Sequence, residues 1–321
     1  MKKNNRFVKA LSIFVILSLF ILLIASCKPM FKPARNNGNC SYELAADYHT
    51  AYDFGSQDSK YVYVLIDQAY DYKHTPEDLK LLSKTITANM FPEDRLVVAW
   101  INLDDSTKTI IFDERVERTR LPEFPPTFIA PPVTPTLTPS NITTIQGQQI
   151  QTNEAIDKDN QVINEKYFCK IGEWNAISDN IYQEWQHEQK EEVDSFNNEA
   201  NSVLAPSIAK NSSSGKLIYE SLSTASQMLQ TAIAKRQHDK YILIVFSDMN
   251  DWRPSKPENI KINLKGIDAL IVSQQCKYEI DCTVKATWET QLTDFRAVNP
   301  LFLVQEDNIS NSIFDYLVNI P

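Results

Sequence analysis

Two runs of apolar residues in this chain each lead to an aspartate. Residues 61–66 are followed directly by Asp67, and residues 241–246 are followed by Ser247 and Asp248. Near-continuous apolar runs of this length are typical of strands buried on both faces of a parallel sheet, and such sheets bind ligands beyond the carboxyl ends of their strands. If both strands are central, the two carboxylates meet in one crevice, where they could hold a divalent cation.

The other apolar patterns predict the sheet and the helices that position these residues. Further buried strands are expected at 95–101, 267–272 and 301–304, and helical stripes at 79–90, 218–233 and 284–295. Strands that alternate with helices predict an α/β fold, a doubly wound, mostly parallel, Rossmann-like sheet with helices on both faces. Residues 109–112 are expected as one antiparallel edge strand, because the turn before them is too short for a helical crossover.

The amino terminus has the pattern of a secretory signal peptide. A basic stretch at 1–9 precedes an uncharged apolar run at 10–25 and then Ile24-Ala25-Ser26-Cys27. The last four residues resemble a bacterial lipobox, whose cysteine is lipid-modified and becomes the mature amino terminus. An uncleaved signal anchor is the alternative. Both predict an extracytoplasmic domain on the cell membrane or outer membrane, because the basic end stays inside.

We expect a signal peptide at 1–27, a tether at 28–58 and one domain at 59–321. Seven prolines between 121 and 140 predict an extended insertion at about 120–165, with little regular structure in its polar continuation. Apolar residues between 174 and 203 predict one bent helix or two short helices. Their tryptophans are expected to be core contacts rather than a sugar-stacking platform.

Four cysteines remain once Cys27 is assigned to lipid, an even number in an oxidising compartment. Only five residues separate Cys276 from Cys282, so a local bridge between them is the easiest of three connectivities. Cys40 and Cys169 are left to pair or to stay free. None of the four histidines lies beside a cysteine, which disfavours a zinc site.

Composition excludes several classes of function. The formal net charge is −9, and it becomes −13 without the first 26 residues, so an acidic body of this kind is not expected to bind nucleic acid. The six glycines form neither a dinucleotide-binding fingerprint nor a phosphate-binding loop, so no nucleotide is expected. There is no Gly-x-Ser-x-Gly elbow, and we expect no enzyme.

The motifs around the two aspartates resemble those of a von Willebrand factor A domain. The residues that carry the resemblance are Asp67-Gln68-Ala69-Tyr70-Asp71 after one strand, Gly215 before a helix, and Phe246-Ser247-Asp248 after the next strand. The similarity covers most of residues 61–305. In that family an Asp-x-Ser-x-Ser turn, a threonine and a later aspartate hold a cation, and the partner protein supplies one more carboxylate.

Only Asp67 and Asp248 match that ligand set. Ala69 and Asp71 stand where the family has serines, and Lys216 stands where it has a threonine. One hypothesis is an altered site for Mg²⁺, Mn²⁺ or Ca²⁺ in which Asp71 joins the two matching aspartates. The other is that Lys216 neutralises them, because clustered carboxylates without a cation repel one another.

The resemblance implies a membrane-anchored, extracytoplasmic binding, adhesion or scaffold module whose partner is a protein or an envelope component. A structural scaffold with a vestigial site is one alternative. A solute-binding lipoprotein would need two α/β lobes with a hinge. A metal-dependent hydrolase would need paired histidines or an activated nucleophile, which the sequence does not offer.

Overall fold

The structure is a computed structural model, which describes residues 40–55, 58–68, 74–101, 109–132, 143–204, 217–249, 256–273, 283–304 and 309–318. The chain forms two compact units. The first comprises Met1–Tyr52 with Glu123–Tyr182, and the second comprises Asp53–Pro122 with Gln183–Pro321. One helix, α3 (Thr143–Leu204), contributes residues to both units.

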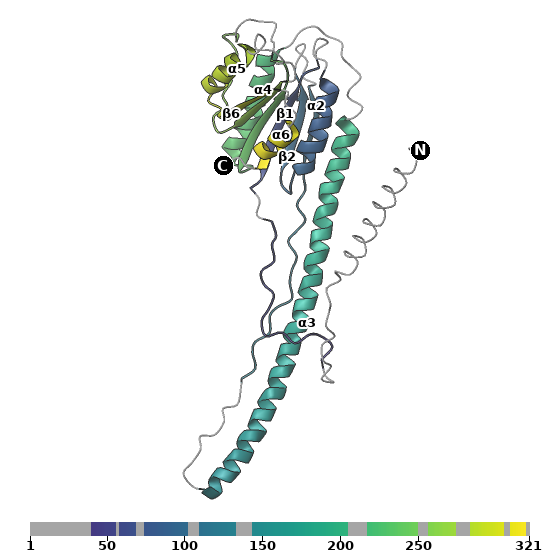
Figure 1. Cartoon of the computed structure of the whole chain (residues 1–321), viewed down its shortest axis with the longest axis vertical. Helices are drawn as coiled ribbons and strands as arrows, with labels where there is room; N and C mark the ends of the chain where they lie inside the picture. The colour runs from purple at the N-terminus through teal and green to yellow at the C-terminus, as the bar shows by residue number, and fades with distance from the viewer. Residues whose placement is uncertain are drawn as a thin grey trace, which may run out of the picture. The chain divides into compact units, whose positions relative to one another are not determined.

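The described strands of the second unit form one six-stranded sheet (Figure 1). Its strands are β1 (Lys60–Ile66), β2 (Arg95–Trp100), β3 (Ile110–Arg115), β4 (Lys240–Phe246), β5 (Asp268–Ser273) and β6 (Val298–Val304). Their order is β3-β2-β1-β4-β5-β6, and every neighbouring pair is parallel except β2 and β3. The predicted α/β fold, with a mostly parallel sheet and one antiparallel edge strand, is confirmed.

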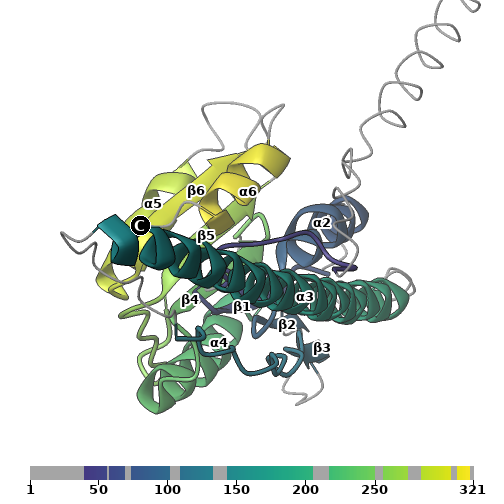
Figure 2. The same cartoon turned by 90° about the horizontal axis from the view of Figure 1, so that it is seen from below.

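Helices cover both faces of the sheet, and Figure 2 shows α2 and α4 on opposite sides of the strands. The helices of this unit besides the end of α3 are α2 (Thr75–Leu81), which continues into η1 (Leu82–Ile86) and η2 (Thr87–Asn89), α4 (Ile218–Lys235), α5 (Thr283–Asp294) and α6 (Ile309–Val318). Alternate residues of a strand point to opposite faces. Accordingly, Tyr63 and Leu65 pack with α4 and α5, whereas Val64 and Ile66 pack with α2, α6 and the end of α3.

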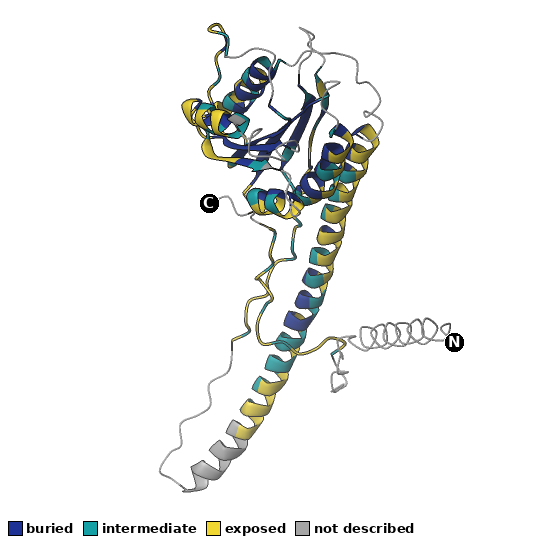
Figure 3. Cartoon of the chain, turned by 45° about the horizontal axis from the view of Figure 1, so that its top comes forward, coloured by how far each residue is buried: buried dark blue, intermediate teal, exposed yellow. Residues whose placement is uncertain are grey.

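The two strands that lead to aspartates are the central ones. Every residue of β1 is buried, and so is every residue of β4 after Lys240 (Figure 3). Ile66 is paired with Phe246, so the chain leaves both strands at the same level of the sheet. Between β1 and β4 the strand order reverses direction, which is the point where doubly wound sheets bind ligands.

In the first unit, two extended segments are held along α3. We name them strap 1 (residues 40–52) and strap 2 (residues 123–132). A disulfide joins Cys40 of strap 1 to Cys169 of α3. Further along, the His49 N–H donates to Asn175 Oδ1 (2.9 Å), and Asn175 Nδ2 donates to the Asp47 carbonyl (3.0 Å). Strap 1 is therefore fixed to the helix covalently and by hydrogen bonds.

Strap 2 is fixed through aromatic side chains. Trp174 Nε1 donates to the Pro125 carbonyl (2.7 Å), and the Phe128 N–H donates to the Tyr48 hydroxyl (2.7 Å). Phe124 stacks on Tyr52, with ring centroids 4.8 Å apart. Proline-rich chain has few backbone donors, so side chains of α3 and strap 1 provide its hydrogen bonds instead.

This unit differs from the sequence-based expectation in three ways. Residues 40–52, expected within a tether, pack on α3, because they carry aromatic side chains and a cysteine that bridges to the helix. The polar stretch up to 165 is helical from Thr143 onward. Residues 174–203 belong to one uninterrupted helix rather than to two short ones.

The structure also bears on the predictions about cysteines and about membrane-spanning segments. Cys40 and Cys169, whose pairing the sequence left open, are bonded to each other. Cys27, Cys276 and Cys282 lie outside the described residues, so lipidation and the second bridge stay predictions. Of the helices in the described ranges, none has the length and apolar character needed to cross a membrane.

Candidate functional site at the carboxyl ends of β1 and β4

Asp67 and Ser247 link the ends of the two central strands. The Asp67 N–H donates to the Phe246 carbonyl (2.9 Å), which continues the ladder between β1 and β4 by one step. Beyond it, Ser247 Oγ donates to Asp67 Oδ2 (2.8 Å). Both Asp67 and Ser247 are fully buried. The register of the two apolar strands thus delivers a carboxylate and a hydroxyl to the same point.

The segment after β1 is tied to the start of α2. Thr75 is buried, and its Oγ1 donates to the main-chain carbonyl of Asp67 (2.8 Å). The residue at the N-cap of α2 is His74, and Thr75 is the first helical residue. The Thr75 hydroxyl therefore fixes the backbone of Asp67 to the first residue of α2.

The segment after β4 is held by α5. Met249 has a φ of 59°, in the left-handed region, and its N–H donates to Ser247 Oγ (2.9 Å). Trp288 Nε1 donates to the Met249 carbonyl (2.8 Å), and both Met249 and Trp288 are buried. A methionine rarely adopts this backbone conformation, so these contacts compensate a local strain. Asp248, between two fixed residues, is half-buried.

The structure places two of the predicted site residues after neighbouring strands. Asp67 and Asp248 follow adjacent strands at one edge of the sheet, as the sequence predicts. Asp71 and Lys216 lie outside the described residues, so the altered cation site and the lysine-neutralised cluster both stay hypotheses. Within the ranges that are described, no group of three or more His, Cys, Asp or Glu side chains could hold a metal ion.

The sequence-based reasoning did not assign Ser247 or Thr75 a place in the site. A serine directly after a buried strand and directly before the matching aspartate was the available signal for Ser247. Ionised carboxylates accept hydrogen bonds and attract positive charge. The groups that carboxylates such as Asp67 and Asp248 can bind are a metal cation and the ammonium or guanidinium of a partner.

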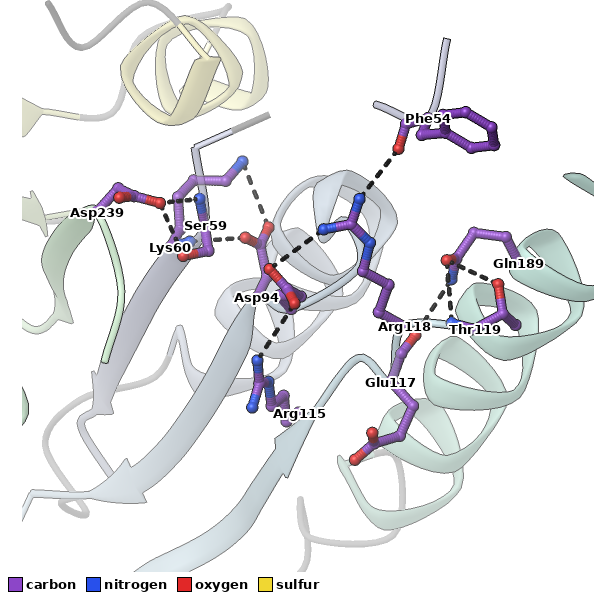
Figure 4. Close-up of polar contacts among 11 residues, drawn as sticks. Phe54, Ser59, Lys60, Asp94, Arg115, Glu117, Arg118, Thr119, Gln189 and Asp239 are labelled. Carbon is purple, nitrogen blue, oxygen red and sulfur yellow. Dashed lines mark hydrogen bonds and ion pairs between the residues drawn. The ribbon is translucent and has the colours of Figure 1, made fainter. Parts of the chain in front are cut away.

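At the opposite, amino-terminal edge of the same sheet lies a second polar cluster (Figure 4). Lys60 begins β1 and Asp94 precedes β2; their side chains are 7% and 1% exposed and approach to 3.5 Å. Asp94 also accepts hydrogen bonds from the N–H groups of Lys60 (2.7 Å) and Phe91 (2.9 Å). Burial raises the pKa of Asp94 to about 6, although Lys60 and these N–H groups act in the opposite direction.

Partly exposed charges surround this buried pair. Glu93 lies between Arg115 (3.8 Å) and Arg118 (3.7 Å), and Arg118 also donates to the Phe54 carbonyl (3.4 Å). On α3, Gln189 accepts from Thr119 and donates to the Glu117 carbonyl. The amino-terminal edge is therefore an internally paired network. Sequence patterns did not reveal it, because its members are single charged residues at strand boundaries.

A polar groove lies on the α4 face of the sheet. It consists of two adjoining cavities of about 350 and 380 Å³ that share Arg95 and Gln237. Arg95 binds both carboxylate oxygens of Asp113 at 2.8 Å, and its guanidinium lies 4.9 Å from the centre of the Tyr61 ring. The pKa of His238 is lowered by burial and then by nearby arginines. The groove's central charges are thus already paired.

Comparison with known proteins does not identify a family. No protein-family model matches this chain, and no curated protein matches it.

Proposed function

We propose that the chain is a membrane-anchored, extracytoplasmic module of von Willebrand factor A type. It binds a protein partner or an envelope component at the crevice beyond β1 and β4. The single observation that carries the proposal is the position of Asp67, which is fully buried at the switch point of the sheet and hydrogen-bonded to Ser247 from the neighbouring strand. Catalysis forms no part of the proposal.

The strand order supports the resemblance. The order β3-β2-β1-β4-β5-β6 is the doubly wound one whose ligands bind at the β1/β4 crevice. The antiparallel β3 was expected from the sequence, and the two motif-bearing segments leave β1 and β4 as the resemblance requires. Membrane anchoring rests on the lipobox-like residues that end at Cys27.

Cation dependence is the finer part of the proposal. Asp67, Asp71 and Asp248 would supply carboxylate oxygens to Mg²⁺, Mn²⁺ or Ca²⁺, whereas Lys216 would make such an ion unnecessary. Calorimetric titration of the full chain with each ion separates the two hypotheses. Heat of binding that disappears in Asp67→Asn supports the cation site, and no heat with any ion removes it.

The binding site is tested by crosslinking and capture from intact cells. We expect Asp67→Asn to lower capture of the partner at least about tenfold, about 1.4 kcal/mol, since it removes a negative charge from the low-dielectric base of the proposed site. Asp294→Asn, at an exposed position of α5, should capture as the unmodified chain does. Equal capture by a folded Asp67→Asn variant would favour the scaffold with a vestigial site.

Two rival functions fit the described structure less well. A solute-binding lipoprotein needs two α/β lobes, but the described part of the chain contains one sheet, and the described residues of the first unit contribute no strand to it. A metal-dependent hydrolase would cleave phosphoesters in the presence of Mn²⁺. Turnover in such a screen that is lost in Asp248→Asn would revive that alternative.

A further inference from the structure

Four apolar side chains of the first unit are exposed where the straps meet α3 near Cys169. We call them the collar: Tyr42 (37% exposed), Leu44 (46%), Phe128 (42%) and Ile129 (94%). Tyr42 and Leu44 belong to strap 1, and Phe128 and Ile129 belong to strap 2. Ile129 is almost fully exposed, and covering exposed apolar side chains such as these four gains free energy.

The strap 1 half of the collar is held close to the helix. Besides the Cys40–Cys169 disulfide, the Ala45 N–H donates to the Phe168 carbonyl of α3 (3.2 Å). A Cβ at Gly172 would lie 1.8 Å from the Glu43 carbonyl oxygen, so only glycine allows the strap to approach here. Tyr42 and Leu44 are therefore exposed on a fixed backbone.

The strap 2 half is held at the same level of α3. The Phe128 carbonyl accepts hydrogen bonds from the hydroxyls of Tyr48 (3.1 Å) and Tyr167 (3.4 Å). Lys170 Nζ lies 5.4 Å from the centre of the Phe128 ring. Both straps thus meet α3 within residues 167–172, less than two helical turns, and the next residue of strap 2 is Ile129.

The collar also lies next to the point where the proposed anchor enters this unit. Cys27 and Cys40 are separated by twelve residues. Whatever its conformation, a chain of this length spans at most about 45 Å. The Cys40–Cys169 bridge fixes the end of that chain to α3, one residue from Lys170. A lipid on Cys27 would keep the collar within this distance of the bilayer.

We propose that the collar inserts into the interfacial layer of the membrane that carries the anchor. This inference rests on the proposed lipid anchor. Ile129, Phe128 and Leu44 would enter the boundary between headgroups and acyl chains, to the depth of about 5–10 Å typical of interfacial segments. Tyr42 would remain at the headgroup level, where tyrosine is enriched. Lys170 would face the lipid phosphates.

The test uses the full chain in a bacterial host that processes lipoproteins. A photoreactive diazirine amino acid replaces Ile129, and illumination of intact cells is followed by mass spectrometry of the adducts. The matched control carries the same group at Ile177, which is 41% exposed on α3 and about 12 Å further along the helix from Cys169. We expect lipid adducts at position 129 and at least about fivefold fewer at position 177, because Ile177 is not part of the collar that would be inserted.

The outcomes separate the collar from the anchor. The mass of the Cys27 peptide reports acylation independently. Acylated protein whose position 129 crosslinks only to another protein, or to water alone, overturns the inference and leaves the anchor intact. Lipid adducts at 129 without acylation support insertion and remove the anchor. Equal lipid labelling at 129 and 177 also overturns the inference, because it shows general proximity to the bilayer rather than insertion of the collar.

Discussion

The two ends of one sheet carry polar residues that are used in different ways. At the carboxyl end, Asp67 bonds to Ser247, and the neighbouring Asp248 is partly accessible. At the amino end, the buried Lys60 and Asp94 balance each other's charge and share hydrogen bonds. Asp67 and Asp248 follow the two strands at the switch point of the sheet, where doubly wound sheets bind ligands, whereas the charges at the amino end are paired with one another. The carboxyl edge is therefore the binding candidate, and the amino edge is a stabilising element.

The largest expected effect concerns the amino edge. Asp94→Ala leaves the Lys60 ammonium buried without its carboxylate, and removal of one partner from a buried ion pair costs about 3–5 kcal/mol. Urea denaturation of the variant and the unmodified chain measures this loss. Asp58→Ala, whose side chain is 66% exposed, should change the free energy of unfolding by no more than about 0.5 kcal/mol.

The double variant Lys60→Met/Asp94→Leu sharpens this result. Apolar replacements of similar volume remove both desolvation costs, so stability should recover to near that of the unmodified chain. Partner capture by this variant should be unchanged. Loss of capture despite recovered stability would contradict the division of roles between the two edges.

The next effect is the pH dependence of stability that Asp94 produces. Its pKa in the folded chain, about 6, lies above the unfolded value of 3.8, so protonation favours the folded state. The stabilisation is complete below pH 3.8 and is lost as the pH rises through 6. A shift of this size corresponds to roughly 3 kcal/mol.

Comparison with Asp94→Asn isolates this contribution from that of the other carboxylates. From pH 4 to pH 7.5, the free energy of unfolding of the unmodified chain should fall relative to that of the variant. Denaturant titrations at four or five pH values provide the measurement. A difference that stays constant across this range would show that Asp94 does not carry the shift.

The sheet could be predicted from the sequence because its strands are nearly continuous apolar runs. The segments before Asp67 and before Ser247 have no competing helical period, so both could be assigned as strands, and their ends were expected to meet if both strands were central. Their register is a finding of the structure. The antiparallel pairing of β3 with β2 could also be predicted, because these two strands are close in sequence. In the second unit, the apolar patterns thus predicted the strands and most of the helices, but not the strand order or α6.

The first unit could not be predicted in the same way. Its straps have no apolar period, and their positions depend on contacts that are distant in sequence, such as the bridge between Cys40 and Cys169, 129 residues apart. Gly172 is equally uninformative in isolation, because glycine within a helix usually only lowers stability. The structure explains the glycine, because the Glu43 carbonyl lies so close to Gly172 that no side chain would fit there.

At the carboxyl edge, Ser247→Ala should lower the free energy of unfolding less than Asp94→Ala does, but it should weaken partner binding more. The substitution removes one hydrogen bond to the buried Asp67 carboxylate and one from the Met249 N–H, so we expect a loss of about 1–2 kcal/mol. Capture of the partner should fall strongly, because the carboxylate loses the donor that orients it. Ser247→Thr keeps a hydroxyl and should restore part of the binding. A stable, fully binding alanine variant would break the comparison between the two edges.

The smallest expected effect comes from the residue that supports this edge from behind. Trp288→Phe keeps an aromatic ring in the core but removes the donor to the buried Met249 carbonyl, at a cost of about 1 kcal/mol. Because Met249 is held at a φ of 59°, loss of that bond should let the segment with Asp248 relax. Thermal unfolding reports the stability, and partner capture should weaken several-fold.

Thr290→Ala on the exposed side of the same helix is the control and should change neither quantity. Weaker capture at nearly unchanged stability would show that the carboxyl edge needs a defined backbone shape as well as its carboxylates, whereas unchanged capture would show that charge alone suffices.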